Sequence, residues 1–205
     1  MQAMKPFMTI LVPLVLIMDP LGNLIFFLMF TEKSTPSERG KVAAVACFTA
    51  FLILVFFGLT GDFVLRFLGI GLPAFQLAGG FIFFIYALQM LRLLPSGLKT
   101  SVEEEKEGMH KNNVALVPLA TPLIAGPGAI TAVLAWQQKM QGPFSIPLLI
   151  LTIMTACMIV YLVFSFGKRI TEFLGVGGIR VVTRLMGLLL AVIAVQFMVN
   201  GFQQI

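Results

Sequence analysis

The stretch FMTILVPLVLIMDPLGNLIFFLMF (residues 7–30) carries one charged side chain, Asp19, in 24 residues. At about 1.5 Å rise per residue, a helix of this length crosses the roughly 30 Å hydrocarbon core of a bilayer. The run is too long for the apolar core of a signal peptide, and no small-residue cleavage pattern follows it. It therefore predicts a first membrane span that stays in the protein.

The rest of the chain has the same character. Of its 205 residues, 59% are hydrophobic and 11% are charged, whereas a soluble domain has about 25% charged residues. Strands with the alternating pattern of a membrane barrel are absent from the sequence, so the spans are expected to be helices. We predict an all-α polytopic membrane protein with six transmembrane helices, near residues 7–30, 42–62, 72–94, 114–136, 144–166 and 183–203.

Lysine and arginine predict the orientation of these spans, because positive residues in short connections are retained in the cytoplasm. One side of the membrane receives 11 of them and the other side receives 3. Both termini are then extracytoplasmic, and the polar loop 95–113 is cytoplasmic. The net charge of +5 does not indicate a nucleic-acid partner, since the basic residues are dispersed between apolar runs.

The chain also repeats itself at an offset close to 107 residues. VPL at 12–14 recurs at 117–119, Pro20 matches Pro127, and FLGIG (67–71) matches FLGVG (173–177). Shared composition of membrane spans is the alternative explanation for these matches. We interpret the chain as one membrane domain, 1–205, with a first three-helix repeat at 1–94 and a second at 114–205. Because three is odd, the second repeat has inverted topology, which is typical of secondary transporters.

Two motifs at equivalent places in this repeat predict helix breaks at mid-membrane. They are MDPLGN (18–23) in the first span and IAGPGAIT (124–131) in the fourth. Proline removes a backbone donor and clashes with the preceding turn. Asp19 and Gly126 then stand as N-caps, with Pro20 and Pro127 at the first helical position. Free N–H groups and the positive end of the helix dipole at such starts attract an anionic group.

These breaks supply the candidate substrate-binding residues. Asp19 is the one carboxylate near the centre of a span, where an unpaired charge costs several kcal/mol. It either caps the following helix or meets a cationic group, and the two roles are compatible. The polar residues around both breaks either contact substrate or join helices. The candidate site comprises Asp19, Pro20, Gly22, Asn23, Thr121, Gly126, Pro127, Gly128 and Thr131.

Gln89 and Gln196 occupy equivalent places in the third and sixth spans, and either line vestibules or join helices. Cys47 and Cys157 lie in apolar runs without a CxxC pattern, which indicates packing residues. No metal site and no cofactor are expected, apart from a coupling Na⁺ or H⁺.

DPLGN with the Glu38–Arg39 pair, followed by PLATPLIAGPGAIT in the second half, resembles the MarC family of six-span inner-membrane proteins, also called the small neutral amino acid transporter family. The resemblance covers essentially the whole chain. It implies a transporter of glycine- and alanine-like amino acids in the cell inner membrane. A zwitterion suits the residues, because half-helix starts bind its carboxylate and Asp19 its ammonium group.

Three other functions would place different demands on the sequence: an intramembrane enzyme, a cation exporter or channel, and a structural protein. An intramembrane protease needs a second carboxylate or a Ser/His pair within the spans, and the sequence offers neither, so no enzyme is expected. The main alternative is a cation exporter or channel of the lysine-exporter-like superfamily, in which Asp19 is the ion ligand. A purely structural protein has no reason to accept two broken spans and a buried charge. The expected partners are a neutral amino acid and the lipid bilayer; assembly into a homo-oligomer is left open.

Overall fold

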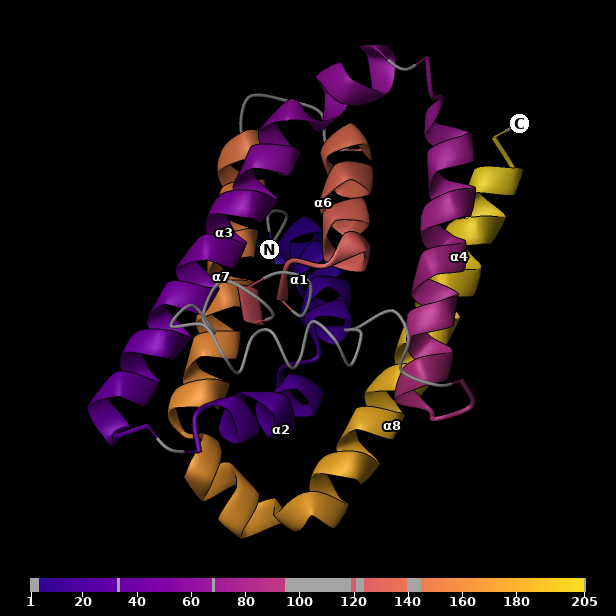
Figure 1. Cartoon of the computed structure of the whole chain (residues 1–205). Helices are drawn as coiled ribbons and strands as arrows, with labels where there is room; N and C mark the ends of the chain where they lie inside the picture. Colours follow the sequence, from indigo (N-terminus) through magenta and orange to yellow (C-terminus); the bar gives the residue numbers. More distant parts are fainter. Residues whose placement is uncertain are drawn as a thin grey trace.

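The computed structural model describes residues 4–32, 34–67, 69–94, 119–120, 124–139 and 145–204, and these residues are almost entirely helical, with no strand among them. The helices are α1 (Met4–Met18), α2 (Pro20–Phe30), α3 (Pro36–Phe67), α4 (Leu72–Met90), α6 (Pro127–Lys139), α7 (Ser145–Ser165) and α8 (Gly167–Phe202). They form one bundle, shown in Figure 1. The all-helical fold class predicted from composition is confirmed.

Five segments within the described residues are long and apolar enough to cross a membrane: Phe7–Phe30, Pro36–Gly61, Pro73–Met90, Ser145–Ser165 and Gly167–Phe202. Of the predicted span 114–136, the structure describes residues 119–120 and 124–136. The count of six spans therefore stays a prediction. The loop 95–113 lies outside the described residues.

The last helix begins earlier than the sequence predicts. Residues 167–182 lie between the predicted spans 144–166 and 183–203, but they belong to α8, and the helix bends at Gly175. Charge keeps a segment out of the hydrocarbon core but does not prevent it from being helical. The helix therefore starts before the predicted span 183–203. Lys168 and Arg169 lie on the part before the bend.

The bend falls at a repeated position. Gly175 has φ 62°, and Gly69, the matching glycine of the FLGIG motif, has φ 66°. Glycine adopts this left-handed conformation without the steric penalty that other L-residues meet. The chain thus turns at matching glycines before the third span of each predicted repeat, which supports the repeat inferred from sequence.

Long helices pack in antiparallel pairs: α3 lies along α7, and α4 lies along α8 (Figure 1). In the second pair glycines allow very close approach. A Cβ atom at Gly80 would lie 2.9 Å from the Ala194 carbonyl oxygen, and one at Gly187 would lie 3.2 Å from that of Ala87. Small residues at such contacts are the usual means by which membrane helices associate, because lipid gives little hydrophobic drive.

The remaining contacts are reciprocal between the halves. The α1–α2 segment packs on α7 and α8, while α6 packs on α3 and α4, so the first span of each half contacts the second and third helices of the other. Buried side chains from all these helices form one continuous core. The 3+3 inverted repeat stays a prediction that this arrangement supports.

Candidate functional site

The DPLGN motif forms a compact junction between α1 and α2. Asp19 leaves helical geometry with φ 43° and ψ 65°, a left-handed conformation that aspartate and asparagine tolerate better than most residues. Its Oδ1 accepts a hydrogen bond from the Gly22 N–H at 3.0 Å, which caps α2, and Pro20 occupies the first turn. Asn23 Nδ2 donates to the Met18 carbonyl oxygen at 2.7 Å, at the end of α1. The motif therefore satisfies backbone groups on both sides of the junction.

Gly22 is required by this arrangement. A Cβ atom at this position would collide with the carboxylate of Asp19. The glycine thus leaves the space in which the carboxylate turns back over the first turn of α2. The resulting side chain is buried, with 1% of Asp19 exposed.

The second junction lies close to the first. Gly126 precedes α6, which begins at Pro127. A Cβ atom at Gly128 would lie 3.0 Å from Ile17 Cγ2 and 3.3 Å from Tyr86 Cε2, so this glycine allows α6 to approach α1 and α4 closely. The Gly128 N–H donates to the Tyr86 hydroxyl. The start of α6 is therefore packed against protein on the side of Gly128.

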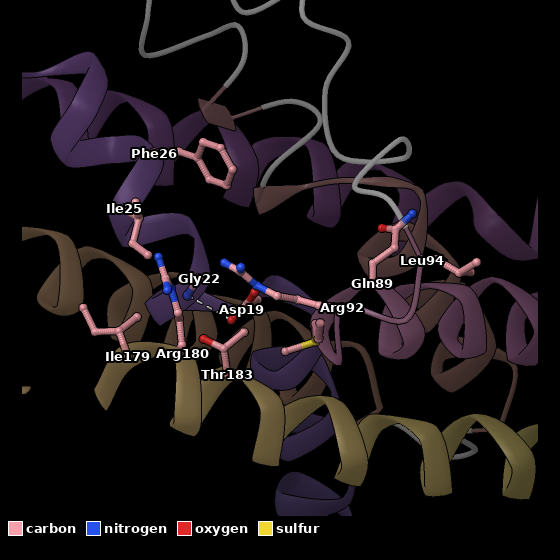
Figure 2. A pocket seen from close by; sticks show the side chains of 11 residues that line it. Asp19, Gly22, Ile25, Phe26, Gln89, Arg92, Leu94, Ile179, Arg180 and Thr183 are labelled. Atoms are coloured by element: carbon pink, nitrogen blue, oxygen red, sulfur yellow. Dashed lines mark hydrogen bonds between the residues drawn. The ribbon is translucent and has the colours of Figure 1, made fainter. Parts of the chain in front are cut away.

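A cavity of about 430 Å³ opens beside the first junction. Asp19 and Gly22 line it together with residues from the middle of α2, from the end of α4 and the turn after it, and from α8 (Figure 2). Three lining side chains are ionisable: the Asp19 carboxylate and the guanidinium groups of Arg92 and Arg180. The two arginines extend toward one another over Asp19 (Figure 2).

Two further polar groups in this wall have no hydrogen-bond partner among the described residues. They are Gln89 Oε1 and Thr183 Oγ1, both buried atoms of side chains that line the cavity. A buried acceptor left without a partner costs roughly 1–3 kcal/mol. The cavity thus holds acidic, basic and neutral hydrogen-bonding groups that a small polar molecule can satisfy together.

The structure places the predicted site residues in three different surroundings. Asp19 and Gly22 line the cavity, whereas Pro20 and Asn23 are buried within the junction behind it. At the second junction Gly126, Gly128 and Thr131 are buried and Pro127 is exposed, and none of them lines this cavity. Thr131 packs where a Cβ of Gly79 would otherwise lie. Thr121 lies outside the described residues.

Arg92, Arg180 and Thr183 are cavity residues that the sequence analysis did not select. Both arginines were interpreted only as topology signals, which is a sufficient explanation for basic residues near span ends. Gln89 was considered as a vestibule residue, and it lines the cavity; Gln196 instead donates to Asn200 on an exposed part of α8. The sequence did contain one indication that Arg180 and Thr183 belong to the same site: they are three residues apart, so they share a face of the helix.

The described residues hold no cluster of three or more histidine, cysteine, aspartate or glutamate side chains suited to a metal ion. Cys47 and Cys157 are buried free thiols. The ionisable chemistry of this cavity is therefore that of one carboxylate and two guanidinium groups.

Comparison with known proteins finds one family over nearly the entire chain. Residues 4–205 match the family described as "MarC family integral membrane protein". A UPF0056 membrane protein of Pyrococcus abyssi is 36% identical over 99% of this chain and 97% of its own length. A UPF0056 membrane protein of Methanocaldococcus jannaschii is 37% identical over 91% of both chains. The UPF0056 membrane protein YvbG of Bacillus subtilis is 31% identical over 95% of this chain and 92% of its own. No solved structure matches the chain significantly.

Proposed function

Because the chain belongs to the MarC family of integral membrane proteins, we propose that it is a secondary transporter of small neutral amino acids such as glycine and alanine. The substrate binds in the cavity over Asp19. The observation that carries this proposal is the set of opposite charges in one small cavity: a buried carboxylate and two guanidinium groups.

These charges are complementary to a zwitterion. Arg92 and Arg180 bind the substrate carboxylate, since guanidinium groups recognise carboxylates through paired, charge-assisted hydrogen bonds. Asp19 Oδ1 caps α2 at 3.0 Å from the Gly22 nitrogen, and the carboxylate as a whole supplies the negative charge that attracts the ammonium group. Gln89 Oε1, which lacks a partner among the described residues, is a further acceptor in the wall of the same cavity. The volume of about 430 Å³ suits a small substrate with some water.

The cavity has access from one side. Arg92, Leu94 and Arg180 at its rim are exposed, and this is the side that the positive charges assign to the cytoplasm. On the side of the second junction, Ala125 and Ala129 are each 1% exposed. We assign this conformation to an inward-open state in the cell inner membrane, with both termini extracytoplasmic. Alternating access then requires one repeat to move against the other around the two junctions.

The alternative, a cation exporter or channel that uses Asp19 as the ion ligand, is less consistent with the cavity. Two guanidinium groups beside one carboxylate leave a positive formal charge around the proposed ion position. That charge repels a bare cation and attracts a ligand that carries a carboxylate.

Competition binding with alanine analogues tests this assignment. Purified protein is equilibrated with radiolabelled alanine and challenged with unlabelled alanine, propionate, which lacks the ammonium group, or ethylamine, which lacks the carboxylate. Propionate and ethylamine should each compete at least tenfold more weakly than alanine, because a hydrogen bond to a charged group contributes about 1.5–3 kcal/mol.

The variant Arg180→Gln then separates the two ends of the substrate. This variant should bind alanine and propionate severalfold more weakly than the wild type, whereas its affinity for ethylamine should be unchanged. Arg184→Gln, one turn further along α8 and outside the cavity wall, is the matched control. Equal competition by all three compounds, or equal effects of the two variants, would contradict zwitterion recognition in this cavity.

A further inference from the structure

Two further hollows lie on the other side of the bundle from the central cavity, between α3 and α7. One is an almost wholly apolar groove of about 610 Å³, lined by residues that include Cys47, Phe48, Met154, Cys157 and Tyr161. The side chain of Phe48 is 62% exposed and that of Met154 is 49% exposed. In a membrane protein this surface faces hydrocarbon, so the natural occupant of the groove is an acyl chain.

The other hollow is a polar pocket of about 440 Å³ at the adjoining ends of the same two helices. Tyr161 lines both hollows, so they adjoin one another. Three cationic residues line the polar pocket, Arg39, Lys168 and Arg169, and none of its described lining residues is a carboxylate. In Figure 1 this region is where the first turns of α3 lie beside the end of α7 and the start of α8.

The positions of these cations are set by local contacts. Arg39 donates from Nε to Thr31 Oγ1 at 3.1 Å and from Nη2 to the Thr31 carbonyl oxygen at 2.8 Å. Arg169 lies 5.9 Å from the centre of the Phe166 ring. The nearby Glu38 is engaged in the cap of α3, where it accepts hydrogen bonds from the Thr35 N–H and hydroxyl at 2.8 Å. Glu172, one turn after Lys168 on α8, does not line the pocket.

The depth of the two hollows matches the predicted membrane boundary. The pocket residues 36–40 and 164–169 fall at the ends of the predicted spans 42–62 and 144–166, at headgroup level. The groove residues 44–51 and 154–161 fall inside those spans. A molecule filling both hollows therefore carries an anionic group at the interface and an apolar chain below it.

We propose that these two adjoining hollows together bind an anionic phospholipid, with the phosphate in the basic pocket and one acyl chain in the groove. Basic pockets between membrane helices on the cytoplasmic side are suited to anionic headgroups. Phosphate oxygens accept charge-assisted hydrogen bonds from lysine and arginine. A free phosphate would leave the apolar groove unused. The lipid bridges α3 and α7, so its binding stabilises the contact between the two halves of the chain, independently of what the central cavity transports.

Gly40 offers a direct test, because it lines the polar pocket and a Cβ atom there would meet nothing within 4 Å. The Cβ of a leucine at this position therefore has space, the rest of its side chain is expected to occupy part of the headgroup pocket, and leucine favours helix more than glycine does. Gly177→Leu is the matched control: that glycine also has open space at its Cβ, and it lies on α8 outside the pocket.

The experiment measures the melting temperature of delipidated protein in detergent after addition of phosphatidylglycerol, phosphatidylcholine or inorganic phosphate. Phosphatidylglycerol should raise the melting temperature of the wild type by several degrees more than phosphatidylcholine does, and inorganic phosphate should have no effect. Gly40→Leu should lose that difference between the two lipids, whereas Gly177→Leu should keep it.

A charge variant gives an independent measurement. Lys168→Gln with Arg169→Gln should also lose the preference for phosphatidylglycerol, while Lys41→Gln with Arg184→Gln, which removes two charges outside the pocket, should keep it. An undiminished preference in both pocket variants would overturn the proposal. Equal stabilisation of the wild type by both lipids, or full stabilisation by inorganic phosphate alone, would do so as well.

Discussion

Replacing Asp19 by asparagine separates the two roles of this side chain. Asparagine caps helices about as well as aspartate and also tolerates a left-handed backbone, so the hydrogen bond from the Gly22 N–H, 3.0 Å in the native protein, is retained at φ 43°. What is removed is the negative charge of a side chain that is 1% exposed. Asp19→Asn is therefore expected to fold with a melting temperature close to that of the wild type, because the cap of α2 is kept.

Asp19→Ala is the comparison variant. It loses the cap, which costs about 0.5–2 kcal/mol, and places alanine in a left-handed conformation, which costs about 1–2 kcal/mol. Together these terms predict a loss of roughly 1.5–4 kcal/mol and a melting temperature several degrees lower. The structural role thus predicts a stability difference between alanine and asparagine, whatever the protein transports.

Transport distinguishes the functional role. In proteoliposomes, Asp19→Asn should lose at least tenfold in alanine accumulation despite its native stability, since the ammonium group no longer meets a carboxylate. Both variants are assayed for melting temperature and uptake at matched protein density. Wild-type uptake by Asp19→Asn would refute charge pairing at this residue and leave Asp19 as a helix cap.

Two further predictions concern the junction and the topology. Gly22→Ala should lower both the melting temperature and alanine uptake, because its methyl group displaces the Asp19 carboxylate. Gly177→Ala, where a Cβ meets nothing within 4 Å, should lower neither. Native stability and uptake of Gly22→Ala would contradict the packing of Asp19 over Gly22. In a Cys-free background, a cysteine replacing Gln203 should react with a membrane-impermeant maleimide in intact cells, and one replacing Ser101 should not. Reversed labelling would contradict the predicted topology and place the opening of the cavity on the extracytoplasmic side.

The main features of the fold could be predicted because they follow from local chemistry. Apolar runs bounded by charges predict helices, and the aspartate, proline, glycine and asparagine of DPLGN each have a separate role at the junction. The equivalent left-handed glycines at 69 and 175 follow from a repeated motif. Such features need no knowledge of which helices are neighbours.

The cavity wall was harder to predict, because it depends on tertiary packing. Arg92 and Arg180 are far apart in the chain and meet only because α4 lies along α8. Gly128 shows the same difficulty: its place in the repeated break suggested ligand contact, and in the structure it lies close to Ile17 and Tyr86. A glycine that admits a ligand and one that admits a neighbouring helix are indistinguishable in sequence.

The most direct test of the proposed function is uptake of a panel of radiolabelled amino acids by proteoliposomes that contain the purified protein, with and without imposed Na⁺ and H⁺ gradients. Glycine and alanine should accumulate above the level in protein-free liposomes, and one of the two gradients should change that accumulation. Gradient-dependent flux of a cation such as K⁺, with no accumulation of any amino acid, would contradict a transporter of zwitterions.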